Sequence, residues 1–176
     1  PRYSIEEMKQ IDAYGIEAGI TVIPVIQTFA HLESIFKWKD YRGLEDANGI
    51  LLVGEPRVYV LIENMIKTIS SCFSSGIIHL GMDEAFSLGR GKYQDLHGVC
   101  DPIKIMQEHV NKVLDIARKY NVKPEMWGDM YFRLAYGAYD TGTVSFDKSE
   151  EVRETIPKDV KIHYWDYYSL DKAHYI

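Results

Sequence analysis

The sequence predicts an α/β fold, a parallel sheet with helices that forms part of a TIM (β/α)8 barrel. Two observations predict it. Helical and strand-like patterns alternate along the 176 residues in the order α-β-α-β-α-β-α-β, an order that gives parallel strands joined by right-handed crossovers. Each strand-like segment is also followed by polar and aromatic residues, and such residues gather at the carboxyl ends of the strands in barrels of this kind.

The length is too short for a whole barrel. Such a barrel takes about 250 residues and eight strands, whereas the 176 residues leave room for four strand-like segments. We therefore expect residues 1–176 to be a fragment of a single (β/α)8 catalytic domain. Half a barrel has two open sheet edges, which a protein must pair or cover. We expect further sequence, or a second copy of the chain in a homo-oligomer, to pair with or cover these two edges.

The composition excludes several classes of partner. The formal net charge is −6 and no cluster of Lys and Arg stands out, so neither nucleic acid nor a membrane is expected as the main partner. No apolar run reaches membrane-spanning length. The two cysteines, Cys72 and Cys100, lack the spacing of metal ligands. No signal peptide is visible, which leaves the location open, with the cytoplasm favoured.

The first helix–strand unit opens the chain. Ser4 and Glu7 have the spacing of a capping box, which predicts a helix that starts there and stops near Gly19. The side chains expected to point inward are Ile5, Met8, Ile11 and Ala18. Residues 20–26 are apolar and largely β-branched, which favours a strand, although Pro24 has no N–H and removes one ladder bond. The residues that follow its carboxyl end include Gln27, Thr28 and His31.

Three more helix–strand units follow a long connection at residues 32–55, a length that is usually functional in a compact domain. Their helices are expected to begin at Pro56, Asp101 and Ser149, because Pro in the first turn and Asp at the N-cap are typical helix starts. Their strands are expected at residues 77–81, 122–127 and 160–165. Residues 132–148 have the composition of a loop.

The segment His79-Leu80-Gly81-Met82-Asp83-Glu84 ends the second predicted strand in two adjacent carboxylates. Side chains alternate in an extended strand, so Asp83 and Glu84 can face one ligand only if the pleat breaks there. Gly81 has no side chain and leaves room for a neighbouring group. Two carboxylates in a partly apolar cleft tend to separate into one charged and one protonated group, which suits general acid catalysis beside a charge-stabilising group. The alternative is that Asp83 caps a turn and Glu84 is solvated.

His79-x-Gly81-x-Asp83-Glu84 resembles the H-x-G-x-D-E signature of the family-20 glycoside hydrolases, the β-N-acetylhexosaminidases. Three other pieces are similar to strand ends of that family, namely Ile23–Ile26 followed by His31, Trp127-Gly128-Asp129, and Tyr164-Trp165-Asp166. The resemblance covers nearly the whole chain, as strands three to six of the family's barrel. The sequence departs from the family pattern at Gln27 and Ala30, where the family commonly has Asp and Gly, although Gln27 can still form a hydrogen bond.

The resemblance implies an enzyme that removes terminal β-linked N-acetylglucosamine or N-acetylgalactosamine. The reaction would retain configuration and use the substrate's own 2-acetamido oxygen as nucleophile. Glu84 would be the general acid and base, and Asp83 would orient the acetamido group. The residues expected to bind the carbohydrate substrate are His31, His79, Trp127, Asp129 and Trp165.

No cofactor and no metal is needed for this reaction. The family's arginine on the first strand, and its Tyr and Asp on the seventh, lie outside this chain. We therefore expect the isolated fragment to be inactive.

Several of the named residues also fit a structural role. His79 lies inside an apolar strand, where a core histidine is as readily expected as a substrate contact. Trp127 and Trp165 can be ordinary barrel core, and Asp129 can cap a turn.

Two other functions fit the same motif. The first is a metal-dependent hydrolase with His31, His79, Asp83 and Glu84 as ligands, since these residue types bind zinc or manganese. Against it, the sequence has no H-x-H or H-E-x-x-H spacing. The second is a non-catalytic sugar-binding module.

Overall fold

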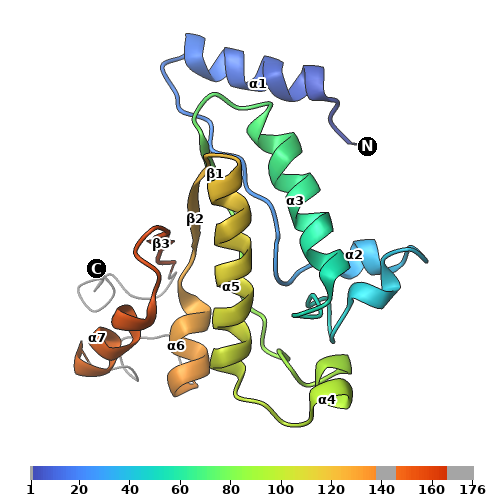
Figure 1. Cartoon of the computed structure of the whole chain (residues 1–176). Helices are drawn as coiled ribbons and strands as arrows, with labels where there is room; N and C mark the ends of the chain where they lie inside the picture. The colour runs from blue at the N-terminus through green and yellow to red at the C-terminus, as the bar shows by residue number, and fades with distance from the viewer. Residues whose placement is uncertain (1, 138–145, 166–176) are drawn as a thin grey trace.

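The computed structural model describes residues 2–137 and 146–165, which form an α/β unit around a parallel sheet (Figure 1). The sheet consists of β1 (Ile77–His79), β2 (Lys123–Trp127) and β3 (Lys161–His163), in that order. Both strand pairs are parallel. The predicted α/β class and parallel sheet are therefore confirmed for the described residues.

Helices lie along the sheet and around its ends. The longest are α1 (Ile5–Glu17), α3 (Pro56–Ser70) and α5 (Pro102–Lys119). The shorter ones are α2 (Glu33–Phe36), the 3-10 helix η1 (Arg42–Leu44), α4 (Lys92–His97), α6 (Asp129–Tyr136) and α7 (Phe146–Thr155). Helices α3 and α5 pack against each other, α3 contacts β1, and α5 contacts β2 (Figure 1). In the described part of the chain, no helix has the length and apolar character to cross a bilayer.

The first three predicted helices, α1, α3 and α5, start where the sequence predicts, whereas the fourth, α7, begins at Phe146 rather than at Ser149 and takes up the end of the predicted loop at residues 132–148. In α1, the Ser4 N–H donates to Glu7 Oε2 at 2.7 Å and the Glu7 N–H donates to Ser4 Oγ at 3.2 Å, which completes the capping box. Pro56 occupies the first turn of α3. Asp101 caps α5, since its Oδ1 accepts from the Ile103 N–H at 3.0 Å. Local capping chemistry thus determines these boundaries.

The predicted inward face of α1 is wrong. Ile5 and Ile11 are 43% and 41% exposed, and Ala18 is exposed as well, while Met8 is half-buried. The buried residues of α1 are Asp12 and Gly15. Asp12 Oδ2 accepts from the Ser74 N–H at 3.0 Å, so a polar contact joins the helix to the turn before β1. No described element covers the apolar side of α1.

The predicted strand at residues 20–26 is only partly formed. Val25 makes an isolated parallel bridge to His79. The His79 N–H donates to Pro24 O, and the Ile26 N–H donates to His79 O, both at 2.9 Å. Pro24 has no N–H to donate, as expected, and no described strand pairs with the other edge of this segment. The segment therefore lies beside β1, opposite β2, without a regular ladder.

The predicted loop at residues 132–148 is wrong at its beginning. Residues 129–136 form α6, which packs on α5 and ends at Gly137 in the left-handed conformation (φ 72°). Met130, Tyr131 and Phe132 are buried there, so apolar packing on α5 favours a helix over a loop. Residues 138–145 and the residues from Asp166 onward lie outside the described structure.

A buried polar network lies beneath the end of the Val25 segment. The Thr28 N–H and Oγ1 both donate to Leu80 O, at 3.2 and 2.8 Å. His109 of α5 is fully buried. Its Nε2 lies 2.7 Å from Thr28 O and its Nδ1 lies 3.3 Å from the Tyr59 hydroxyl. Because Thr28 O can only accept, His109 carries a proton on Nε2. Burial lowers the pKa of His109 to about 4.

This network predicts a loss of stability in mild acid. The unfolded state takes up a proton on His109 near its ordinary pKa of 6.5, but the folded state resists until about pH 4. The free energy of unfolding should therefore fall as the pH drops through this window, by roughly 1.4 kcal/mol per unit for this group. Urea unfolding at a series of pH values measures the slope.

The variant His109→Gln keeps an N–H for Thr28 O but does not titrate, so we expect a shallower slope from it. His97→Gln is the matched control at an exposed histidine and should keep the wild-type slope. Equal slopes in wild type and His109→Gln would contradict the assignment.

Candidate active site

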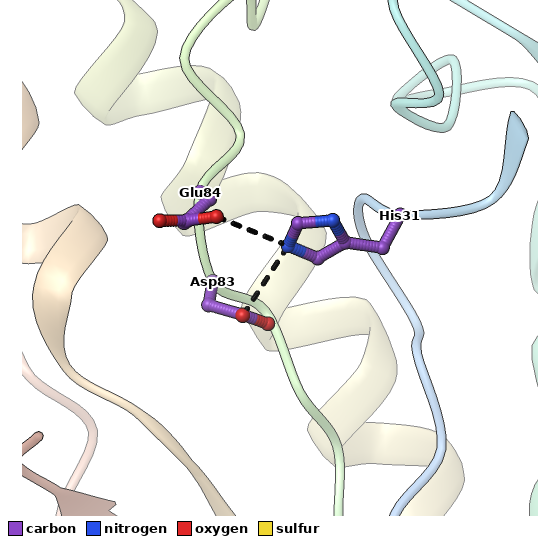
Figure 2. Close-up of side chains that lie close together, drawn as sticks. All are labelled: His31, Asp83 and Glu84. Atoms are coloured by element: carbon purple, nitrogen blue, oxygen red, sulfur yellow. Dashed lines mark ion pairs between the residues drawn. The ribbon is translucent and has the colours of Figure 1, made fainter.

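The backbone leaves the extended conformation immediately after β1. Gly81, Met82 and Glu84 have φ angles of 70°, 72° and 54°, all in the left-handed region. This is the break in the pleat that the sequence requires if Asp83 and Glu84 are to face the same ligand. Both carboxylates indeed point toward one side chain, that of His31 (Figure 2).

His31 joins the two carboxylates. Its Nε2 lies 3.3 Å from Asp83 Oδ2 and 3.7 Å from Glu84 Oε2 (Figure 2). The three side chains are partly exposed, at 39%, 18% and 36%, so a ligand can reach them. Asp83 and Glu84 follow His31 by 52 and 53 positions in the sequence. They lie next to it because the carboxyl ends of parallel segments lie at one edge of the sheet.

Asp83 has a second partner in Gln27. The Gln27 Nε2 donates to Asp83 Oδ1 at 3.2 Å. The hydrogen bond expected from Gln27 is therefore present, and it goes to Asp83. Each oxygen of the Asp83 carboxylate has its own neighbour, and Asp83 does not cap a turn.

Asp129 lies behind Glu84. It is fully buried, and its Oδ2 accepts from the Glu84 N–H at 3.2 Å and lies 3.4 Å from Arg133 Nε. Burial raises the pKa of Asp129 to about 6, against the opposing effects of the Glu84 N–H and Arg133. In this position Asp129 acts on the site through the backbone of Glu84. Its Oδ1 is buried and has no hydrogen-bond partner among the described residues, and a contact from Asp129 to the sugar stays a prediction.

His79 and Trp127 form the inner wall of the site. His79 is 5% exposed, and its Nδ1 accepts from the Gly81 N–H at 3.1 Å. Its ring centroid lies 4.6 Å from that of Trp127. Burial, followed by the charge of His163, lowers the pKa of His79 to about 4, so the imidazole is neutral at pH 7. The ring packs against Trp127, while its Nε2 is buried and has no hydrogen-bond partner among the described residues. A contact from His79 to the substrate stays a prediction.

Two cavities meet at Glu84. One, of about 300 Å³, is lined by Asp83, Glu84, Trp127 and Trp165. The other, of about 260 Å³, includes His31, Glu84, Phe86 and Ser87 in its lining. Both tryptophans named from the sequence therefore line the cavity that contains the carboxylate pair. Glu84 is a lining residue of both cavities.

The metal-ligand set proposed from sequence is only partly assembled. His31, Asp83 and Glu84 offer ligand atoms that lie within 4.8 Å of one another. His79 does not belong to this group of neighbouring ligand atoms among the described residues.

Sequence reasoning missed Arg133 as a member of the site. It lies four residues after Asp129, a helical spacing that brings oppositely charged side chains together. Its guanidinium also lies over the Phe86 ring, with 5.2 Å from Cζ to the centroid. The spacing would have indicated this pair if residues 129–136 had been predicted as a helix.

The sequence matches the family model "Glycosyl hydrolase family 20, catalytic domain" over residues 2–174. The chain belongs to this family.

Relatives and solved structures of family 20 agree with the match. A probable beta-hexosaminidase of Arthroderma benhamiae is 27% identical over 190 residues, which cover 93% of this chain and 28% of the relative. The exo-β-N-acetylglucosaminidase of Vibrio harveyi, solved with N-acetylglucosamine, superimposes with a TM-score of 0.68 at 17% identity, covering 94% of this chain and 26% of that one. The β-N-acetylhexosaminidase of Bacteroides fragilis gives a TM-score of 0.68 at 21% identity, covering 98% of this chain and 33% of that one.

The chain thus spans about a quarter to a third of the length of these family-20 proteins. At these identities the solved structures show the shared fold, which is compatible with part of a TIM barrel.

Replacement of Asp129 tests how Glu84 is held in the family-20 site. Asp129→Ala leaves the Glu84 N–H without its acceptor, and we expect turnover to fall about tenfold or more. Asp129→Asn keeps an acceptor oxygen and resembles the protonated acid. Its rate should therefore match wild type below about pH 5 and fall behind above pH 6, where wild-type Asp129 is charged and accepts a stronger hydrogen bond.

The measurement is kcat/KM against pH for wild type and both variants. Asp40→Asn, at an exposed position, is the matched control and should follow wild type at every pH. An Asp129→Ala enzyme with wild-type turnover would show that the contact does not position Glu84.

Proposed function

We propose that the protein is a β-N-acetylhexosaminidase that removes terminal β-linked N-acetylhexosamine by a retaining, substrate-assisted mechanism. Residues 1–176 would supply strands three to six of its catalytic barrel. The observation that carries the proposal is the meeting of His31, Asp83 and Glu84 beside a cavity lined by Trp127 and Trp165. Family membership supports a carbohydrate as substrate.

Glu84 acts first as the general acid. Its proton passes to the glycosidic oxygen while the substrate's acetamido oxygen attacks the anomeric carbon, so the glycosidic bond breaks and a cyclic oxazolinium ion forms. In the second step water attacks the anomeric carbon and gives a proton to the Glu84 carboxylate, while the bond from the anomeric carbon to the acetamido oxygen breaks and the acetamido group is restored. The position of Glu84 between the two cavities suits both transfers, because the sugar and its leaving group lie on opposite sides of the cleaved bond.

Asp83 stabilises the intermediate. Its carboxylate accepts the acetamido N–H and lies near the positive charge of the oxazolinium ion. This interaction is strongest once that charge has developed, and it therefore lowers the barrier rather than merely tightening substrate binding.

The remaining residues shape the site. Trp127 and Trp165 provide apolar surface around the acetamido methyl group. His31 orients both carboxylates from the opposite side. His79 supports Trp127, and Asp129 acts through the Glu84 backbone.

Two variants separate the roles of the carboxylates. Glu84→Gln cannot donate the proton, so kcat should fall about 100- to 10,000-fold on alkyl or sugar leaving groups and much less on a nitrophenyl leaving group that departs without protonation. For Asp83→Asn, kcat should fall on both kinds of leaving group, because the neutral amide stabilises the positively charged oxazolinium ion less than the carboxylate does. Steady-state kinetics on a matched pair of N-acetylglucosaminides measures both effects.

Glu6→Gln, an exposed change on α1, is the control. An unchanged rate in Glu84→Gln on sugar leaving groups would show that Glu84 is not the acid, whereas sugar binding without any hydrolysis by the wild-type protein would favour a non-catalytic sugar-binding module.

A metal-dependent hydrolase is the second candidate, because His31, Asp83 and Glu84 lie close enough to share an ion. Metal analysis of the purified protein separates the two functions. Stoichiometric metal whose removal abolishes activity and whose return restores it would overturn the acetamido mechanism. Full activity after treatment with a chelator would exclude the metal-dependent reaction.

A further inference from the structure

Gln27 is held rigidly before its side chain reaches the site. The residue before it, Ile26, donates its N–H to His79 O at 2.9 Å. The residue after it, Thr28, donates both its N–H and its hydroxyl to Leu80 O. The backbone of Gln27 is therefore fixed on both sides against β1 and the residue that follows it.

The Gln27 amide can satisfy Asp83 in one orientation only. Its Nε2 donates to Asp83 Oδ1 at 3.2 Å. The opposite orientation would place two acceptors, Gln27 Oε1 and Asp83 Oδ1, against each other. In the favourable orientation Oε1 is buried and has no hydrogen-bond partner among the described residues. Among the described residues, Asp83 is thus the one hydrogen-bond partner of this amide.

Gly81 makes the approach of Gln27 possible. A Cβ at position 81 would overlap Gln27 Oε1 and lie 2.8 Å from Gln27 Cδ. The φ angle of Gly81, 70°, is also one that other residues rarely adopt. The space that Gly81 leaves open is therefore occupied by the Gln27 amide, and the glycine and the glutamine act together to place a donor beside Asp83.

We propose that Gln27 is a positioning residue for Asp83, which it orients through a neutral donor. The inference rests on the proposed function and deepens it. Together with His31, which lies 3.3 Å from Oδ2, Gln27 fixes the plane of the Asp83 carboxylate toward the acetamido group. A carboxylic acid at position 27 would have to share a proton with Asp83 to make the same contact, since two adjacent carboxylates repel each other. The amide needs no proton and therefore holds Asp83 in the same way at every working pH.

Gln27→Met tests the donor while keeping the length and nearly the volume of the side chain. The loss of one hydrogen bond to a charged group should lower kcat on an aryl β-N-acetylglucosaminide about 10- to 100-fold. KM should change much less, because Asp83 acts mainly on the charged intermediate. Gln10→Met, the same change at an exposed position of α1, is the matched control. Circular dichroism melting of both variants shows whether the fold is retained.

Gln27→Glu gives a signature that a merely structural role would not produce. Below the pKa of the new acid, its O–H can donate to Asp83, so activity relative to wild type should be highest at low pH. Above it, the two carboxylates repel and relative activity should collapse. A Gln27→Glu enzyme whose rate stays in constant ratio to wild type across the pH range would overturn the proposal, as would a Gln27→Met enzyme with wild-type kcat.

A crystal structure of unliganded Gln27→Met separates this inference from the proposed function. If the Asp83 carboxylate rotates away from its wild-type position, the positioning role stands even where the wild-type protein hydrolyses no acetamido sugar. If Asp83 keeps its position, the positioning role is overturned whatever the activity.

Discussion

The candidate site depends on a break in the extended backbone directly after β1. In a regular strand Asp83 and Glu84 would project to opposite faces of the sheet. The left-handed φ angles of Gly81, Met82 and Glu84 instead turn both carboxylates toward His31. For residues with a side chain this conformation costs about 1–3 kcal/mol each, so the surrounding structure has to hold Met82 and Glu84 in place.

The contacts that hold the break come from three directions. Met82 is fully buried in the core, Asp129 accepts the Glu84 N–H from behind, and Gln27 holds Asp83 from the neighbouring segment. That segment is tied to Leu80 and α5 through Thr28 and His109. The carboxylate pair on this turn is thus fixed by partly buried polar contacts from residues outside the motif itself.

The sequence predicted the parts of the site that depend on local chemistry. Alternation of side chains implied the broken pleat, and the resemblance to family 20 placed His31 and the Asp83–Glu84 pair in one site. The sequence-based prediction failed for features that depend on contacts between residues far apart in the sequence. An apolar stripe on α1 does not reveal whether a neighbour covers it, and Ile5 and Ile11 are exposed. Nor does the sequence show that Asp129 is buried behind Glu84, because this depends on α6, whose packing on α5 was not foreseen.

The central claim is that Asp83 and Glu84 serve a reaction in which the substrate's own acetamido group is the nucleophile. The most direct test compares hydrolysis of an aryl β-N-acetylglucosaminide with that of the matching aryl β-glucoside by the full-length protein. We expect a strong preference for the acetamido sugar, because the glucoside lacks the nucleophile. Equal rates on the two sugars would mean that the protein supplies the nucleophile, and would contradict the roles given to Asp83 and Glu84.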